Sequence, residues 1–465
     1  MDLVRKKHAR MNYLDYRATA SFIIGMFKTV FINSDGLISR INPPSNRTIF
    51  DNFDDIAPFF LFFDEEKFLI DQIKLLKNKS FEEILSENNL IYSYKIDEYL
   101  GGLYAVWKKT GDQTAKDILD DGIDKVREYF IFENDLFGVY DIYKRKTVRH
   151  TYFWSAGILE TFLEMLDDYQ YLSHTVKSIC DHWIEISDSK CYTLFPFRYT
   201  ENRFLGLVNK ISAGVGFYRG HQPQSYKPNS SFNNSLLRFK MFLFYVSSGQ
   251  FSQLMKANST FIFTIMKLFQ ITNDLKYKAT VDFWIVSVAN KMIKNNVVFG
   301  ILLSNGTIKN TDLTHTFIFA DILIDFCAFI EENQSYIDLT RIILMKRLKT
   351  MWQIGLLPME IGGTIAHIDS NLDFSITLRR YGDLTGEKKW KSISLQLIHS
   401  ILTHYRSDNG FYSLVNIHGD FVAAGKVNAV DPKYNGLLLK GIINAITLED
   451  NMYENLYLHD LFKDR

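Results

Sequence analysis

Apolar residues recur at three- and four-residue spacing along most of the chain, a pattern that predicts helices. Two kinds of helical pattern alternate. Residues 100–108, 153–166, 317–330 and 374–384 are apolar on nearly every side. Each such run is followed by one with apolar residues on a single face and charges on the other. The first kind predicts an inner helix surrounded by protein, and the second an outer helix with one face in solvent.

A short polar turn joins each inner run to the outer run that follows. It contains Gly, Asn or acidic residues and leads into an aromatic residue or alanine at residues 64–68, 110–115, 167–171, 272–277, 332–336 and 385–390. The turn recurs at intervals of about 50 residues, and once at about twice that interval, as expected of an internal repeat. Gly or Asn is suited to ending the first helix, and the acid faces the positive end of the second.

Longer segments with Gly, Pro and aromatic residues connect one helical hairpin to the next, and we expect short extended pieces or small β-hairpins there. Such hairpins either stack into an open superhelix or close into a ring. The first helical run, residues 13–32, has the outer pattern without an inner partner, and the last, residues 434–446, has the inner pattern without an outer partner. We therefore predict that these two helices pair and close a ring. Residues 232–271 leave the number of hairpins at six or seven.

The repeated turn, best developed in Arg380-Tyr-Gly-Asp-Leu-Thr-Gly-Glu-Lys-Lys-Trp390, and loops such as Gly355-Leu-Leu-Pro358 resemble those of the (α/α) toroid glycosidases and their relatives. That group includes six-hairpin glycoside hydrolases, seven-hairpin mannosidases, sugar 2-epimerases and polysaccharide lyases. The resemblance covers residues 54–446 and contains no catalytic signature of a single family. It implies an all-α (α/α)6 or (α/α)7 barrel, a toroid of helical hairpins with long loops and small β-hairpins on one face.

The resemblance also implies one domain over residues 1–465. Within it, residues 1–53 form an N-terminal outer helix and lead-in, residues 54–446 the hairpin repeats, and residues 447–465 a C-terminal tail.

The composition narrows the function further. The 465 residues carry 53 basic and 53 acidic side chains, so no excess of positive charge favours binding to nucleic acid. Neither a membrane-spanning run nor a secretory signal is apparent, which predicts a cytoplasmic protein with no membrane partner. The three cysteines have no metal-type spacing, and glycine-rich nucleotide motifs are absent. We therefore expect no cofactor, with a calcium ion at the barrel mouth left open.

In a closed ring the long loops and the starts of the inner helices face one mouth. The polar residues at those starts would then line a common cavity. Glycoside hydrolysis needs two carboxylic acids across the bond that breaks, one of them kept protonated by its surroundings. Our catalytic candidates, in order, are Asp373, Asp97, Asp55, Glu98 and Asp312. The alternative for each one is a helix N-cap, a position where Asp is common.

Aromatic, histidine and arginine side chains at the same positions, and in the least repetitive segment, are candidates for binding sugar. They are Arg149, His150, Tyr152, Trp154, Arg198, Tyr199, Tyr218, Arg219, His221, His315, His367, Asp369, Asp431 and Tyr434. Arginines would suit a carboxylate-bearing sugar, since a guanidinium binds a carboxylate through two hydrogen bonds.

Three functions remain open. The first is a glycoside hydrolase acting on an oligosaccharide at the barrel mouth through a pair of carboxylic acids. The second is a sugar epimerase or polysaccharide lyase that acts on a uronate with His, Tyr and Arg. The third is a non-catalytic toroid that binds glycan or protein.

Overall fold

The computed structural model describes residues 15–45, 47–151, 153–189, 253–302, 308–422 and 430–449. The chain divides into two compact units. The first comprises Met1–Lys79, Gly102–Lys116 and Thr350–Arg465, and the second Ser80–Gly101 and Asp117–Lys349. The assignment of residues 1–465 to one domain stays a prediction.

Helices make up about 63% of the structure, in agreement with the all-α prediction. The helices of the first unit are α2 (Tyr16–Thr29), α3 (Ala57–Phe62), α4 (Glu66–Leu76), α16 (Ile368–Thr385), α17 (Lys388–His404) and α18 (Pro432–Glu449). Those of the second unit are α5 (Phe81–Leu85), α8 (Ala156–Glu164), α9 (Leu172–Ser189), α12 (Met255–Thr272), α13 (Leu275–Met292), α14 (Leu313–Phe329) and α15 (Gln334–Leu348). Helices α6 (Ile96–Thr110) and α7 (Gln113–Tyr129) each contribute residues to both units.

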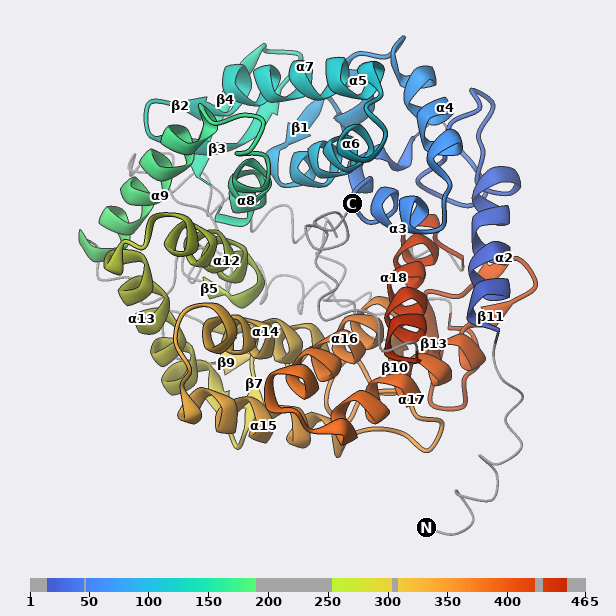
Figure 1. Ribbon diagram of the computed structural model, residues 1–465, viewed down its shortest axis with the longest axis vertical. Helices are drawn as coiled ribbons and strands as arrows, with labels where there is room; N and C mark the ends of the chain where they lie inside the picture. Colours follow the sequence, from blue (N-terminus) through green and yellow to red (C-terminus); the bar gives the residue numbers. More distant parts are fainter. Residues whose placement is uncertain are drawn as a thin grey trace, which may run out of the picture. The chain divides into compact units, whose positions relative to one another are not determined.

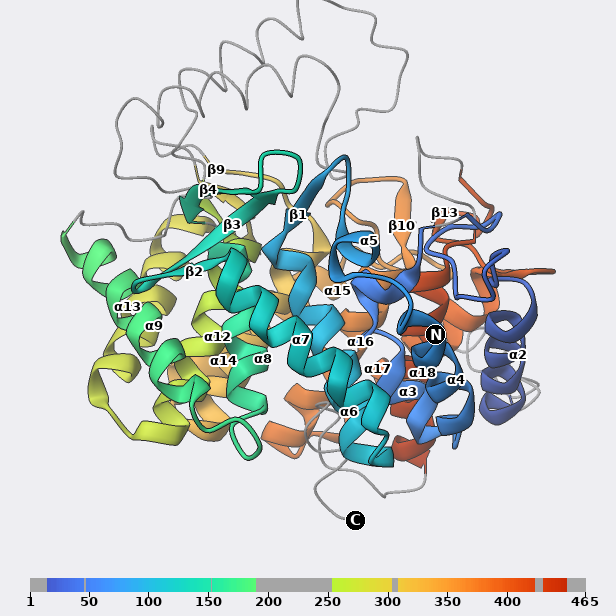
Figure 2. The same ribbon diagram turned by 90° about the horizontal axis from the view of Figure 1, so that it is seen from above.

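The strands are short and pair antiparallel, in agreement with the small hairpins predicted between helices. In the second unit, β3 (Asp135–Asp141) pairs with β1 (Leu90–Tyr92), β2 (Ile131–Phe132) and β4 (Lys146–Thr151). There β8 (Ile301–Leu302) also pairs with β5 (Gln253–Leu254) and β9 (Ile308–Lys309), and β6 (Ile293–Lys294) with β7 (Val297–Val298). In the first unit, β10 (Ile365–His367) pairs with β13 (Leu414–Asn416), and β11 (Arg406–Ser407) with β12 (Gly410–Phe411). The sheet of β1, β3 and β4 lies at one end of the helices of its unit (Figure 2).

Consecutive helices pack as hairpins within each unit. The pairs are α3 with α4 and α16 with α17 in the first unit, and α8 with α9, α12 with α13 and α14 with α15 in the second. The last helix, α18, packs against α2, the first helix of the described residues, and also against α3 and α16 (Figure 1). The predicted pairing of the first and last helices is confirmed.

The tight turns contain the capping groups that the sequence indicated. Asp274 caps α13 by accepting a hydrogen bond from the backbone N–H of Lys276 at 3.1 Å. Asn333 caps α15 in the same way. Gly386 ends α16 in the left-handed conformation, with φ 70°. These caps satisfy backbone groups that a helix end leaves without a partner, and so they specify where each helix begins or ends.

Two inner helices begin earlier than the hydrophobic pattern indicated. Helix α16 starts at Ile368 and not at Phe374, and α14 starts at Leu313 and not at Phe317. The predicted starts were wrong because the polar residues ahead of each apolar run were assigned to the preceding loop. In α16 a polar first turn is stabilised from outside the helix, since the buried Asn371 side chain bonds to the loop at Leu357.

The core of the first unit is centred on α18, whose Leu438, Leu439, Ile442 and Ile443 are fully buried. Apolar burial of this kind is the main force that holds such helices together. Over the residues that the structure describes, no helix combines the length and the apolar character that crossing a membrane requires.

Candidate active site

The strongest chemical feature of the first unit is the carboxyl group of Asp373, on α16. Lys440 Nζ of α18 donates a hydrogen bond to its Oδ1 at 3.3 Å, and the Asp373 side chain is 25% exposed. Burial raises the pKa of Asp373 to about 6; Lys440 opposes this rise, whereas the nearby carboxylates of Asp369 and Asp55 add to it. A carboxyl group with such a pKa exchanges its proton close to neutral pH, as a general acid must.

Asp373 does not lie at a helix start, where the sequence had placed it. It is the sixth residue of α16, which begins at Ile368. Its raised pKa therefore comes from burial and neighbouring charge, and it caps no helix.

The start of α16 carries two further predicted residues, His367 and Asp369. His367 ends β10 and occupies the N-cap position of α16 without a capping hydrogen bond from its side chain. Asp369 lies in the first turn. Asn371 holds this turn in place, because its side chain accepts a hydrogen bond from Leu357 N and donates to the carbonyl oxygens of Leu357 and His367.

The start of α18 repeats this arrangement. Asn435 accepts a hydrogen bond from Phe411 N at 2.9 Å and donates to the carbonyl oxygens of Phe411 and Asp431. Like Asn371, it is the fourth residue of its helix and is fully buried. Each asparagine thus fixes the preceding long loop to an inner helix.

Tyr434 links the two helix starts. Its ring meets the His367 ring edge to face, with centroids 4.7 Å apart and planes at 89°. Burial raises the pKa of Tyr434 above its ordinary value, and the carboxylates of Asp369 and Asp431 add to the rise. The phenol therefore stays protonated near neutral pH and is able to donate a hydrogen bond.

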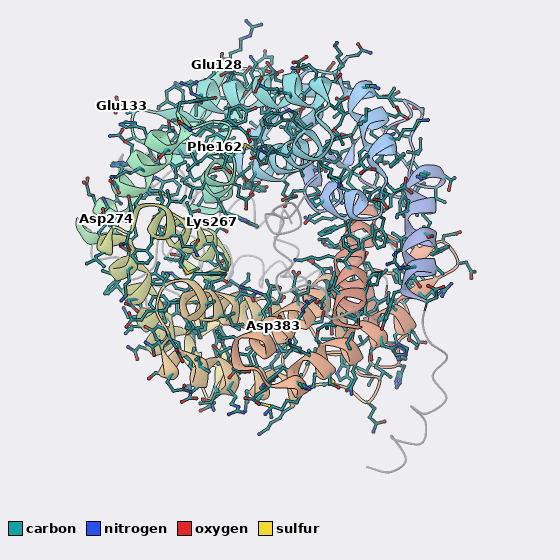
Figure 3. All side chains as sticks on the ribbon, in the orientation of Figure 1. Glu128, Glu133, Phe162, Lys267, Asp274 and Asp383 are labelled. Atoms are coloured by element: carbon teal, nitrogen blue, oxygen red, sulfur yellow. The ribbon has the colours of Figure 1, made fainter. Side chains whose placement is uncertain are left out.

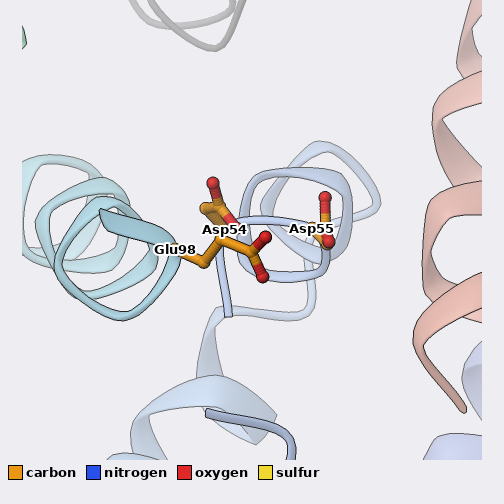
Figure 4. A group of neighbouring side chains, drawn as sticks. All are labelled: Asp54, Asp55 and Glu98. Atoms are coloured by element: carbon orange, nitrogen blue, oxygen red, sulfur yellow. The ribbon is translucent and has the colours of Figure 1, made fainter. Parts of the chain in front are cut away.

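Asp55 lies beside α18 because two contacts hold it there. Lys433 Nζ lies 2.8 Å from Asp55 Oδ2, and both side chains are about four-fifths buried, with 18% and 22% exposed. A Cβ on Gly436 would lie 2.7 Å from Ile56 Cγ1 and 3.4 Å from the Asp55 carbonyl oxygen, so only glycine permits this approach. Figure 4 shows Asp54 and Asp55 on the segment leading into α3, and also labels Glu98 of α6.

Asp431 is held by an arginine from the lead-in segment. Arg40 donates to Asp431 Oδ1 at 3.0 Å, while Asp431 Oδ1 also accepts from the backbone N–H of Lys433 at 2.9 Å. Asp51 lies near the same guanidinium, 3.6 Å from Arg40 Nε, and pairs with Arg47 at 3.0 Å. Asp431 is therefore a structural cap and ion-pair partner at the start of α18.

Four predicted residues of the second unit lie at the starts of α6 and α14, and Trp154 lies in the turn before α8. Asp97 and Glu98 lie in the first turn of α6. Asp312 is the N-cap of α14 and accepts a hydrogen bond from Thr314 N at 2.9 Å. This agrees with the helix-cap alternative to a catalytic role. His315 follows in the first turn and is 9% exposed, with its ring packed so closely on Gly300 that a Cβ there would lie 1.9 Å from Nε2.

Six predicted sugar-binding residues lie outside the described residues. They are Tyr152, Arg198, Tyr199, Tyr218, Arg219 and His221. Arg149 and His150 belong to β4, but their side chains are likewise outside the described part of the chain.

The basic residues near the acids were missed by the sequence analysis. Lys440 is the single charged residue within the apolar run of α18. A lone charge in such a run suggests a buried partner, and this signal could have identified Lys440. Lys433 and Arg40 had no distinguishing pattern.

Lys267 of α12 is a similar lone charge in the second unit (Figure 3). It lies 3.0 Å from Glu160 and 2.5 Å from Glu164, both on α8. Burial raises the pKa of Glu160, and Lys267 opposes this rise. The cluster ties two inner helices together through ion pairs.

Comparison with known proteins identifies the fold. No protein-family profile matches the chain, and no curated protein matches it in sequence. Among solved structures, an α-1,2-mannosidase from Trichoderma reesei aligns with a TM-score of 0.60 and 11% identity, over 95% of this chain and 93% of that one. A D-mannose isomerase aligns with a TM-score of 0.56 and 10% identity, over 94% and 98% of the two chains. A cellobiose 2-epimerase from Spirochaeta thermophila aligns with a TM-score of 0.55 and 9% identity, over 78% and 87%.

These likenesses show the fold alone. The chain shares the (α/α) barrel fold of these structures, which confirms the predicted fold class. One fold of this kind carries different chemistries, so the activity must be argued from the site.

Proposed function

We propose that this protein is a carbohydrate-active enzyme that hydrolyses a glycosidic bond of an oligosaccharide, with Asp373 as the general acid. The observation that carries the proposal is the partly buried Asp373 carboxyl, whose pKa is raised to about 6. The similarity of the fold to a mannosidase and to two enzymes named for sugars supports carbohydrate as the substrate class.

Asp55 is the second carboxyl group of the proposed mechanism. Its charge is close enough to raise the pKa of Asp373, and its carboxylate forms an ion pair with Lys433. Glycoside hydrolysis uses two carboxyl groups, one as the acid and the other as base or nucleophile. Asp373 would protonate the departing oxygen, and Asp55 would serve as base or nucleophile.

The test compares substrates whose leaving groups differ in basicity. We expect Asp373→Asn to lower kcat on a natural manno- or cello-oligosaccharide by about 100-fold or more, the scale of general acid catalysis. On a 2,4-dinitrophenyl glycoside of the same sugar the loss should be much smaller, because a weakly basic leaving group departs without a proton.

Asp55→Asn is the matched comparison. It should impair both substrates alike, since a base or nucleophile is needed whatever the leaving group. An Asp373→Asn enzyme that retains full activity on oligosaccharides would reject Asp373 as the acid.

A second function, epimerisation or isomerisation of a sugar, is supported by the contact between His367 and Tyr434. An imidazole next to a protonated phenol provides a base and an acid for proton transfer beside a carbonyl group. Incorporation of solvent deuterium at a sugar carbon, abolished by His367→Gln and insensitive to Asp373→Asn, would select this function over hydrolysis.

A further inference from the structure

Two aromatic side chains of the second unit stack at the starts of neighbouring inner helices. The rings of Tyr94 and Trp154 are nearly parallel, at 18°, with centroids 5.2 Å apart. Tyr92 adds a third ring, 5.5 Å from Tyr94 and tilted by 41°. Tyr94 belongs to the 3-10 turn Ser93–Lys95 before α6, and Trp154 to the 3-10 turn Phe153–Ser155 before α8.

Hydrogen bonds between adjacent residues hold this pair in position. The hydroxyl groups of Ser93 and Ser155 bond to each other, and Ser93 Oγ also donates to the Gly138 carbonyl oxygen at 3.2 Å. Both serines are fully buried. Because each serine is the sequence neighbour of one stacked ring, the bond between them fixes the spacing of the two rings.

A carboxylate lies at the same two helix starts. Asp97 follows Tyr94 by three residues, and Gly157 follows Trp154 by three. A Cβ on Gly157 would lie 1.9 Å from Asp97 Oδ2, so the carboxylate rests directly on the backbone of α8. Asp97 Oδ1 is buried as well, so this carboxylate packs the two helix starts against each other.

The exposure of the rings distinguishes them from core aromatics. Trp183 and Trp390 are fully buried, whereas Tyr94 and Trp154 are neither buried nor fully exposed. The partial exposure leaves ring surface that a ligand can contact.

We propose that Tyr94 and Trp154 form a binding subsite for a neutral pyranose ring. The C–H face of a sugar packs on an aromatic ring, whose face carries partial negative charge. This inference rests on the proposed function only in that the ligand is a carbohydrate, and it does not depend on Asp373 as the acid.

The local charges favour a neutral sugar over a uronate. Asp97 and its neighbour Glu98 lie in one turn of α6 and would repel a sugar carboxylate. Lys95 of the same segment forms an ion pair with Glu87 at 2.8 Å, so its charge is already balanced by a carboxylate of the protein.

The test is direct binding of cello- and manno-oligosaccharides of two to four units, measured by calorimetry on the full chain with Asp373→Asn as the common background. We expect Trp154→Ala to weaken binding by about tenfold or more, on the scale of aromatic anchors in binding sites. Trp154→Phe keeps a flat ring and should retain most of the affinity. The control is Trp107→Ala, because Trp107 is also partly exposed and pairs with Tyr104, at 5.9 Å.

Equal loss of affinity in the Trp154→Ala and Trp107→Ala proteins would overturn the subsite, as would a parent protein that binds none of these oligosaccharides. Tighter Trp154-dependent binding of a glucuronate-containing disaccharide would overturn its preference for a neutral sugar. Trp154-dependent binding in a protein whose turnover does not need Asp373 would leave the subsite standing and reject the proposed catalytic role.

Discussion

Lys440 of α18 donates a 3.3 Å hydrogen bond to Asp373 of α16, and this pair joins two inner helices through one proton-exchanging carboxyl group. The lysine stabilises the charged carboxylate, while burial and the charges of Asp369 and Asp55 favour the protonated acid. The balance leaves the pKa of Asp373 at about 6. Activity and stability should both depend on this balance.

The pH dependence of activity should report the pair. If Asp373 is the acid, kcat falls as the pH rises through about 6, because the protonated form is lost. Lys440→Met removes the charge that lowers this pKa, so the same limb should move to higher pH. Lys388→Met, at an exposed position of α17, is the control and should leave the limb in place. If Lys440→Met leaves the pH–kcat profile unchanged, the ionisation of Asp373 does not control kcat.

The pH dependence of stability should change in Asp373→Asn. The pKa of Asp373 is higher in the folded state, about 6, than the ordinary 3.8, so the folded protein binds the proton more tightly. The wild-type protein therefore loses this stabilisation as the pH rises through about 6, whereas the asparagine variant does not titrate. We expect urea unfolding to show a relative gain for the variant of about 1 kcal/mol between pH 5 and pH 7.5. Parallel stability curves would mean that the pKa is not raised.

Asp312 should behave as a helix cap. Its carboxylate accepts the hydrogen bond of Thr314 N at the start of α14, a function that asparagine fulfils equally well. We expect Asp312→Ala to lower the free energy of unfolding by about 1 kcal/mol and Asp312→Asn to change it little. Both variants should keep kcat near that of the wild type. A large loss of kcat in the stable Asp312→Asn protein would instead assign this carboxylate to catalysis.

Gly436 tests the packing that positions Asp55, and Gly25 is its control. Gly436→Ala places a methyl group 2.7 Å from Ile56 Cγ1, so it should lower the free energy of unfolding by about 1–3 kcal/mol and lower activity through displacement of Asp55. Gly25 of α2 has nothing within 4 Å of its Cβ position. Gly25→Ala should therefore stabilise the protein by about 0.5–1 kcal/mol, since alanine is the better helix former. Thermal melts of the two variants should shift in opposite directions.

Much of the fold followed from local patterns. The alternation of all-round and one-sided apolar runs predicted inner and outer helices, and the polar turns predicted caps such as Asp274 and Asn333. These features depend on residues within a few positions of one another, so they are readable along the chain. The pairing of α2 with α18 was also predictable, because each lacked a neighbour of the other kind.

The site was only partly predictable, because it depends on contacts between residues far apart in the sequence. The sequence alone identified Asp373, Asp55, His367 and Tyr434 as polar residues near inner-helix starts, but it misplaced Asp373 ahead of α16 and gave no partner for any of them. The tertiary structure decided those partners. Lys440 lies 67 positions from Asp373 along the chain, and Arg40 lies 391 positions from Asp431. Whether a carboxyl group is protonated depends on burial and on charges a few ångströms away, and only the packing of α16, α18 and α3 brings those charges together.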